Sequence, residues 1–125
     1  MAQEKPKVLL VDDDHDMLEV LDTAMQTLGF QTVLARDGEE GWNKFVEHRP
    51  SLVISDIYMP KKNGVILLDQ IKEMQYDTKV ILITGYAHYK QLISHSRFPP
   101  DEFLSKPFNL RDLVEKIKDA HDEEA

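Results

Sequence analysis

The feature that most constrains the fold is a set of short apolar runs in which polar residues do not alternate. Three of these runs read VLLV at residues 8–11, LVIS at 52–55 and VILIT at 80–84. A strand exposed on one face alternates polar and apolar residues, whereas such runs are typical of strands buried on both faces. The chain is therefore expected to form a sheet that helices cover on both sides.

Five strands are expected, and helical patterns separate them. The strands are Lys7–Val11, Gln31–Ala35, Leu52–Ser55, Val80–Thr84 and Phe103–Ser105. Strands that alternate with helices along a chain form a parallel sheet with right-handed crossovers. The predicted fold class is therefore α/β.

Apolar residues spaced three and four apart predict five helices between and after these strands. The residues expected to face inward are Leu18, Leu21, Met25 and Leu28 in the first helix, Trp42, Phe45 and Val46 in the second, Ile66, Leu67 and Ile71 in the third (Val65–Met74), Tyr89, Leu92 and Ile93 in the fourth (about Ala87–Ser96), and Leu110, Leu113, Val114 and Ile117 in the last. Asp14, Asp37 and Asn109 are expected to cap helix N-termini, and Gly29 to end the first helix.

Composition limits the kind of partner. The 125 residues include no cysteine, which excludes disulfides and thiolate metal sites, and the N-terminal MAQEKPK has no signal-peptide pattern. The net charge of −8 disfavours direct binding to nucleic acid or to anionic lipid, and no run is long enough to span a membrane. A cytoplasmic protein with protein partners is expected.

Polar residues follow four of the five predicted strands. Asp12 and Asp13 come after the first strand and Asp56 after the third, while Thr84 ends the fourth and Lys106 follows the fifth. These side chains are expected to lie together, because ligands of parallel sheets bind at the carboxyl ends of the strands. Close carboxylates need a cation to stay ionised, and a site with few carboxylates and several waters suits Mg²⁺.

Magnesium that keeps part of its water shell binds phosphate oxygens, so a phosphoryl group is the expected ligand. Asp56 can attack phosphorus as a carboxylate nucleophile and form an acyl phosphate. Lys106, Thr84 and the metal ion would then share the charge on the remaining phosphoryl oxygens. The residues thus indicate a pocket in which an aspartate accepts phosphate.

Four motifs, in this order, match the receiver domains of the bacterial two-component response regulators: VLLVDDD, LVISDIYMPKKNG, VILITG and FLSKPF. The chain resembles such a domain from Lys7 to Ala120. The resemblance implies a doubly wound, flavodoxin-like parallel sheet of five strands in order 2-1-3-4-5, flanked by five helices. Residues 1–125 are therefore expected to form a single receiver domain with a core of about 7–120.

The resemblance also implies a role for each motif residue. Asp56 corresponds to the phosphoacceptor, and Asp12 and Asp13 correspond to the acids that hold Mg²⁺ together with Asp56 and the backbone carbonyl of Tyr58. Thr84 and Lys106 correspond to the phosphate-binding hydroxyl and ammonium. Phe103 corresponds to the switch aromatic, which turns inward as Thr84 moves. The bond between Lys106 and Pro107 corresponds to a peptide that is cis in relatives.

The function implied by the resemblance is a signalling switch and not an enzyme, with phosphorylation from a donor and self-dephosphorylation as its only chemistry. The phosphoryl donor would be a histidine kinase or a histidine phosphotransfer protein. Phosphorylation would shift the face from strand four to the last helix and control a downstream protein or a fused output domain. The mixed charges of the last helix, Arg111, Lys116 and Lys118 among acids, suit a homodimer contact as well as a solvated face.

Three departures from the family pattern stand out. Pro99-Pro100 replaces a common Gly-Ala before the last strand, and Phe103 has no hydroxyl where many relatives carry tyrosine. Tyr58 and Tyr86 follow the acceptor and Thr84 by two residues, and we expect their rings to slow hydrolysis of the acyl phosphate.

Three other interpretations share part of this residue pattern. A haloacid-dehalogenase-like phosphatase uses a similar set of groups, but its nucleophile follows the first strand in a DxDx(T/V) pattern, and Asp16 stands at the last place of that pattern. An EF-hand loop fails because Met17 and Thr23 occupy its glycine and glutamate positions. An interaction module that is not phosphorylated stays open.

Overall fold

The computed structural model describes residues 5–85, 93–94 and 96–122 of the chain. Five parallel strands form one sheet in the order β2-β1-β3-β4-β5. The strands are β1 (Lys7–Val11), β2 (Gln31–Ala35), β3 (Leu52–Asp56), β4 (Lys79–Thr84) and β5 (Glu102–Ser105). The predicted fold class, strand order and five strands are confirmed, with strand ends that move by one residue at most.

Burial differs between the middle and the edges of the sheet. Every residue of β3 is buried, and β1 and β4 are buried except at their first residue. The edge strands β2 and β5 mix buried and exposed residues. The uninterrupted apolar runs therefore belong to the three strands that have neighbours on both sides, as expected for a sheet covered on both faces.

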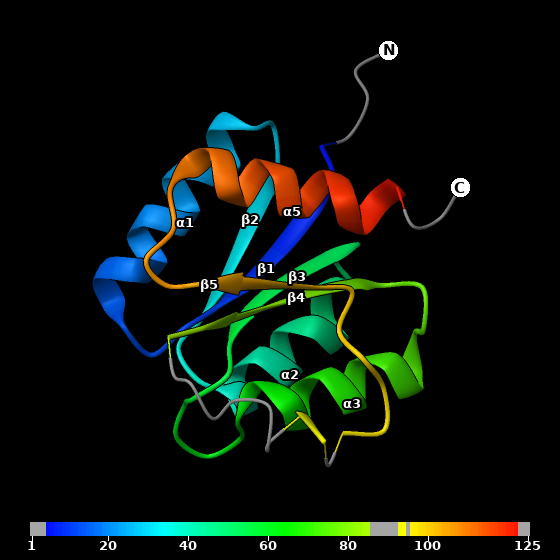
Figure 1. Ribbon diagram of the computed structural model, residues 1–125. Helices are drawn as coiled ribbons and strands as arrows, with labels where there is room; N and C mark the ends of the chain where they lie inside the picture. Colours follow the sequence, from blue (N-terminus) through cyan, green and yellow to red (C-terminus); the bar gives the residue numbers. More distant parts are fainter. Residues whose placement is uncertain (1–4, 86–92, 95, 123–125) are drawn as a thin grey trace.

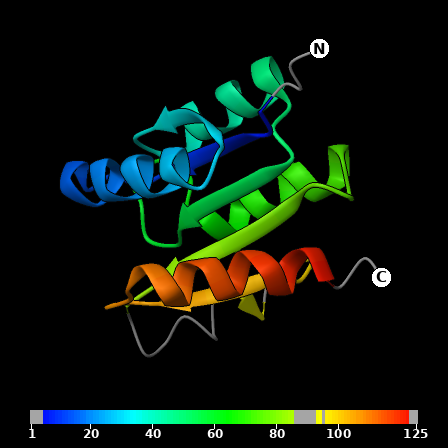
Figure 2. The ribbon, with the colours of Figure 1, turned by 90° about the horizontal axis from the view of Figure 1, so that it is seen from above.

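Four helices are described, and they lie on the two faces of the sheet. They are α1 (His15–Thr27), α2 (Gly38–His48), α3 (Gly64–Met74) and α5 (Leu110–Asp122). Figures 1 and 2 show α1 and α5 on one side and α2 and α3 on the other. The predicted helix at about Ala87–Ser96 falls mainly on residues outside the described ones, so four of the five expected helices are seen.

The helix starts follow the predicted capping residues. The Asp14 carboxylate accepts hydrogen bonds from the backbone N–H groups of Asp16 and Met17, and the Asp37 carboxylate accepts one from Glu40. The Asn109 side chain accepts a hydrogen bond from the N–H of Asp112 at 2.9 Å. Each cap satisfies an N–H group that has no partner inside its helix.

The end of α1 is also as predicted, because Gly29 follows its last turn with a φ of 95°. This left-handed conformation costs glycine little, since glycine has no Cβ atom. Position 29 thereby turns the chain toward β2.

The hydrophobic core has two parts, one on each face of the sheet. The part under α2 and α3 includes Phe45, Leu67 and Ile71, and the part under α1 and α5 includes Leu21 and Met25. Alternate residues of each central strand serve the two parts in turn, since neighbouring strand residues point to opposite faces. The sheet is thereby fixed from both sides, and its carboxyl edge is left for the site.

Four apolar residues that were predicted to face inward are exposed instead. They are Leu28, Val46, Ile66 and Leu110. Successive helix residues lie about 100° apart around the axis, so a neighbour of a buried residue easily points outward. Val46 adjoins the buried Phe45, and Ile66 lies between the buried Val65 and Leu67. These inward assignments were wrong because each helix buries a narrower stripe than its apolar residues suggest.

Among the residues that the structure describes, no helix has both the length and the apolar character that crossing a membrane requires.

Candidate functional site

The polar residues predicted at the strand ends are brought to one edge of the sheet. Asp12 follows β1 and lies in the interior, and Asp56 is the last residue of β3 and is also buried. Thr84 is the buried last residue of β4, and Lys106 follows β5 directly. The parallel register pairs Thr84 with Ser105 and places Asp56 beside Ile83, so the strand ends are level.

Three carboxylates form the centre of the site. One carboxylate oxygen each from Asp12, Asp13 and Asp56 can be chosen so that all three lie within 4.8 Å of one another. Asp13 is exposed, while Asp12 and Asp56 are buried. Oδ1 of Asp12 accepts a hydrogen bond from the N–H of Asp14 at 2.9 Å, which fixes the carboxylate toward the site.

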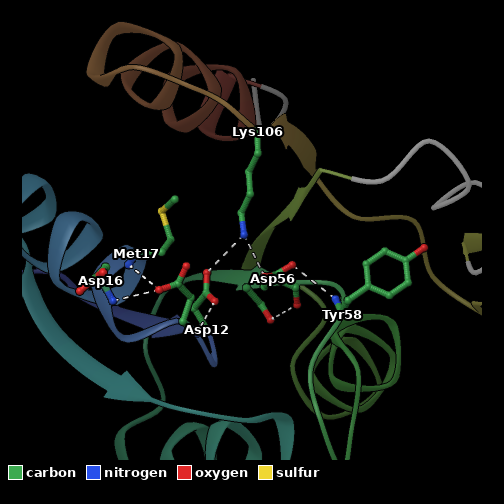
Figure 3. Close-up of polar contacts among 8 residues, drawn as sticks. Asp12, Asp16, Met17, Asp56, Tyr58 and Lys106 are labelled. Carbon is green, nitrogen blue, oxygen red and sulfur yellow. Dashed lines mark hydrogen bonds and ion pairs between the residues drawn. The ribbon is translucent and has the colours of Figure 1, made fainter.

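Lys106 brings a positive charge to this cluster. Its Nζ lies 3.0 Å from Oδ2 of Asp56 and 3.9 Å from Oδ2 of Asp12. Figure 3 shows the lysine side chain directed toward these acids. Its backbone N–H donates to the carbonyl of Thr84 at 2.8 Å, which ties the start of the lysine loop to the end of β4. The ammonium group of Lys106, which follows β5, therefore reaches the acids at the ends of β1 and β3.

The charges at the site change the pKa of two of its groups. Burial raises the pKa of the Asp12 carboxyl to about 6, and repulsion from Asp56 and Asp13 adds to this, while the Asp14 N–H and Lys106 oppose it. Burial by itself would lower the pKa of the Lys106 ammonium, but its hydrogen bond and charge attraction to Asp56 raise it above its ordinary value. The carboxylates therefore lack compensating positive charge, and Lys106 stays protonated.

The donor set fits a hard divalent cation. Oδ2 of Asp12 is buried and has no hydrogen-bond partner among the described residues. An unpaired carboxylate oxygen in the interior is costly unless a cation or a water molecule reaches it. Together with nearby oxygens from Asp13 and Asp56, it offers the oxygen ligands that Mg²⁺ prefers.

Tyr58 lies next to the acids through its backbone. Its N–H donates to Oδ1 of Asp56 at 3.3 Å, and Figure 3 shows its ring directed away from Asp56 and Lys106. The metal-binding role of the Tyr58 carbonyl group stays a prediction. The ring of Tyr58 does not flank Asp56 here, and Tyr86, the second ring expected to slow hydrolysis, is outside the described residues.

Phe103 lies on β5, half-buried, and packs against the core under α2 and α3. Thr84, the partner predicted for it, is buried at the end of the neighbouring strand. The peptide bond between Lys106 and Pro107 is cis, as the resemblance implied. The predicted switch residues therefore lie on the neighbouring strands β4 and β5.

Two glycines that sequence reasoning did not assign to the site shape the loop after Asp56. A Cβ atom at Gly64 would lie 2.4 Å from the backbone oxygen of Asp56, and one at Gly38 would lie 2.1 Å from the oxygen of Lys62. Asn63 caps α3 through a hydrogen bond from the N–H of Ile66 at 2.9 Å. The close approach of two backbones leaves no signal in a single sequence.

Comparison with known proteins identifies the relatives of this chain. The family model described as "Response regulator receiver domain" matches residues 8–118. The transcriptional regulatory protein PrrA of Mycobacterium tuberculosis is 33% identical over 113 residues, which are 90% of this chain and 48% of PrrA. The chain spans about half the length of the curated relatives it matches.

Solved structures agree with the sequence match. A CheY-like response regulator receiver domain protein from Methanospirillum hungatei has a TM-score of 0.86 at 31% identity, covering 96% of both chains. The response regulator protein TrrA from Thermotoga maritima, solved in complex with Mg²⁺ and BeF, has a TM-score of 0.83 at 36% identity, covering 92% of this chain and 98% of that one. The fold thus has counterparts of known structure.

Proposed function

Since the chain belongs to the response regulator receiver domain family, we propose that it is a switch in which Asp56 accepts a phosphoryl group. One juxtaposition carries the proposal. Oxygens of Asp12, Asp13 and Asp56 lie within 4.8 Å of one another, and the Lys106 ammonium lies 3.0 Å from Asp56. Clustered acids beside one fixed cation form a pocket suited to a metal ion and a phosphoryl group together.

In the proposed reaction, a carboxylate oxygen of Asp56 attacks the phosphorus of a phosphohistidine on a partner protein. The P–O bond forms as the P–N bond breaks, and the electron pair of that bond returns to the imidazole, which takes up a proton. The product is an acyl phosphate on Asp56. Water later attacks the phosphorus, releases inorganic phosphate and restores the carboxylate, so the chain returns to its starting state.

The other residues of the site would bind and orient the phosphoryl group. Asp12, Asp13 and Asp56, with the backbone carbonyl of Tyr58, would hold Mg²⁺, which when bound supplies positive charge to the phosphoryl oxygens. Lys106 would bind one further oxygen through its ammonium group. The burial of Asp12 and Asp56 supports this role, because charges interact more strongly where water is excluded.

Phosphorylation would be reported through Thr84 and Phe103. We expect the Thr84 hydroxyl to donate a hydrogen bond to the phosphoryl group and Phe103 to turn further inward as Thr84 moves. Phe103 has no hydroxyl, so packing would be its means of signalling. One new dianion with a few charge-assisted hydrogen bonds can supply the few kcal/mol that shift a two-state equilibrium.

The proposed partners follow from this chemistry. A histidine kinase or histidine phosphotransfer protein would donate the phosphoryl group, and a downstream protein or a fused output domain would read the face from β4 to α5. The net charge of −8 argues against direct binding of nucleic acid by this domain. Residues 1–125 would act as one receiver domain in the cytoplasm, with self-phosphorylation and self-dephosphorylation as its chemistry. A homodimer stays a prediction.

Two other functions use part of the same set of residues. A haloacid-dehalogenase-like phosphatase is not favoured, because the family match over residues 8–118 is to receiver domains. A receiver domain that binds partners without being phosphorylated is the outcome that an experiment must exclude.

Mass measurement of the intact protein after incubation with acetyl phosphate and Mg²⁺ tests the proposal. We expect one phosphoryl group on the wild type and none on the Asp56→Asn variant or without Mg²⁺. Asp16→Asn is the matched control, because Asp16 is an exposed aspartate beside the site with no assigned role. It is expected to be phosphorylated like the wild type.

A wild type without an adduct would contradict the proposal, provided that rapid hydrolysis is excluded. A beryllofluoride complex, observed through changed backbone amide resonances around Asp56, would reveal a functional pocket even if the acyl phosphate is short-lived. Absence of both the adduct and the beryllofluoride complex would mean that the domain acts by binding alone.

A further inference from the structure

A buried lysine lies outside the proposed site and has no part in its chemistry. The Lys72 side chain on α3 is only 4% exposed. Its Nζ donates hydrogen bonds to the backbone oxygens of Tyr76 at 3.1 Å and Thr78 at 2.7 Å, and to Oδ2 of Asp101 at 2.8 Å. A lysine ammonium has three hydrogens, so these three acceptors use all of its donors.

Asp101 is fixed on two sides immediately before β5 begins. Its N–H donates to the carbonyl of Val80 at 2.9 Å, and its Oδ2 accepts from the N–H of Val80 at 2.7 Å and from Lys72. The residue thereby joins the start of β5 to β4 and to α3. The contacts of Asp101 thus fix the position of the start of β5 along β4.

A second side chain of α3 holds the segment just before Asp101. The Asp69 carboxylate accepts hydrogen bonds from the N–H of Arg97 at 3.0 and 3.1 Å and from the N–H of Phe98 at 3.1 Å. The Phe98 ring also lies edge-on to the ring of Tyr76. Figure 1 shows this segment passing beside α3 on its way to β5.

The strand that these contacts fix is short and carries the groups of the proposed switch. β5 has four residues, pairs only with β4 in the described sheet, and includes Phe103. Lys106 follows it directly and reaches Asp56 at 3.0 Å. In a sheet, a shift of one residue turns every side chain to the opposite face, so an edge strand of this length needs a fixed start.

We propose that Lys72 and Asp101 are positioning residues that hold β5 in register, so that the Lys106 ammonium meets Asp56. The proposal rests on the function proposed above for Asp56 and Lys106. It adds that contacts at the start of β5 determine the position of Lys106 at its end. Pro99 and Pro100, directly before Asp101, restrict the backbone conformations of the segment that leads to the Lys72–Asp101 contact.

The test is a double-mutant cycle with Lys72→Met and Lys106→Met, read first in the metal-free protein by NMR. We expect Lys72→Met to move the side-chain resonances of Lys106 toward those of an unpaired lysine. The second measurement is the Mg²⁺ dissociation constant. The Lys106 ammonium repels a dication at the acids, so Lys106→Met is expected to tighten Mg²⁺ binding roughly threefold or more.

Lys72→Met is expected to tighten Mg²⁺ binding in the same direction and to slow phosphorylation by acetyl phosphate. In the Lys106→Met background it is expected to change neither quantity further. Generally lower stability would not tighten Mg²⁺ binding, because a protein that stays folded under the conditions of the measurement keeps the same metal site. Asp101→Asn keeps the size of the side chain and serves as a milder variant if Lys72→Met folds poorly.

Met25→Ala is the matched control. Met25 is a fully buried residue of α1, a helix that packs mainly against β1 and β2, and its truncation lowers stability. It is expected to leave the Lys106 resonances and the Mg²⁺ dissociation constant unchanged.

Two outcomes would overturn the positioning role: Lys72→Met behaving like Met25→Ala at equal stability, or effects of Lys72→Met and Lys106→Met that add. The proposed function fails separately, if the wild type is not phosphorylated. In that case the change of the Lys106 resonances in the Lys72→Met variant still shows whether Lys72 positions Lys106.

Discussion

Two lysine–aspartate pairs at opposite ends of the sheet have similar distances between their charged atoms but differ in exposure and in hydrogen bonding. Lys106 lies 3.0 Å from Asp56 at the carboxyl edge, and Lys72 lies 2.8 Å from Asp101 near the start of β4 and β5. The Lys106 side chain is 27% exposed, whereas that of Lys72 is 4% exposed.

The two pairs also differ in how completely their atoms are bonded. Lys72 uses its three donors on Asp101 and on two backbone oxygens. At the other end, Oδ2 of Asp12 has no hydrogen-bond partner among the described residues, although it is buried. An ion pair whose donors all have acceptors can hold elements together but cannot bind a ligand. An ion pair beside a carboxylate oxygen without a hydrogen-bond partner can bind one. Unused bonding capacity, and not the short distance, marks the candidate site.

The largest effect is expected on stability, from Lys72→Met. Removing Lys72 takes away the nearest positive charge of Asp101, which keeps only the more distant Lys79 at 3.9 Å, and two backbone oxygens would lose their donor as well. We expect the free energy of unfolding to fall by about 3–5 kcal/mol, measured by urea denaturation in saturating Mg²⁺. A loss below about 1 kcal/mol, the range typical of exposed ion pairs, would show that this pair is not the structural one.

The next largest effect is expected on chemistry, from Lys106→Met. The partly exposed ammonium contributes less to stability, but in the proposed reaction it faces the oxygens on which charge develops. Loss of one such group typically slows a reaction by about 10²-fold, and we expect this for phosphorylation by acetyl phosphate, with a stability change of about 1 kcal/mol or less.

Lys62→Met is the matched control for Lys106→Met, because Lys62 is another partly buried lysine near the site and donates to Gln70 at 3.2 Å. It is expected to keep the wild-type rate. Equal rates for the Lys106→Met variant and the wild type would remove the distinction between the two pairs.

The fold could be predicted from the sequence because its strongest signals are local. Buried runs such as LVIS identify the central strands, and capping residues such as Asp14 and Asn109 fix helix starts within a residue. The inward faces were predicted less well, as Val46 and Ile66 show, because the facing element decides which part of an apolar stripe is buried. That information is not contained in the helix itself.

The candidate site was predictable for a different reason. Parallel strands bring their ends to one edge, so Asp12, Asp56 and Lys106 could be placed together without any knowledge of side-chain contacts. Lys72 and Asp101 escaped prediction because they are 29 residues apart and no motif connects them. A lysine on an amphipathic helix is also expected to be exposed to solvent. The burial of Lys72 follows only from the packing of α3 against the segment before β5.

The smallest effect concerns pH and involves the carboxylates on the Lys106 side. The pKa of Asp12 is raised from 3.8 to about 6 by burial and by its acidic neighbours. The folded metal-free protein therefore binds a proton more readily than the unfolded chain between these two pH values. The stabilisation is complete below pH 3.8 and is lost as the pH rises through about 6.

For the metal-free protein, this means that the free energy of unfolding should rise by about 1 kcal/mol between pH 7.5 and pH 5 through Asp12 alone. Lys106, with its pKa raised above the ordinary value, stays protonated over this range and adds no pH dependence. Asp12→Asn should abolish the increase, and saturating Mg²⁺ should reverse it, because the metal binds the ionised carboxylate and is released on protonation. The Lys72–Asp101 pair should contribute to neither response, so an Asp12→Asn variant that keeps the full pH dependence would place its origin outside the acidic edge. Urea denaturation at constant ionic strength, with and without Mg²⁺, measures both responses in one series.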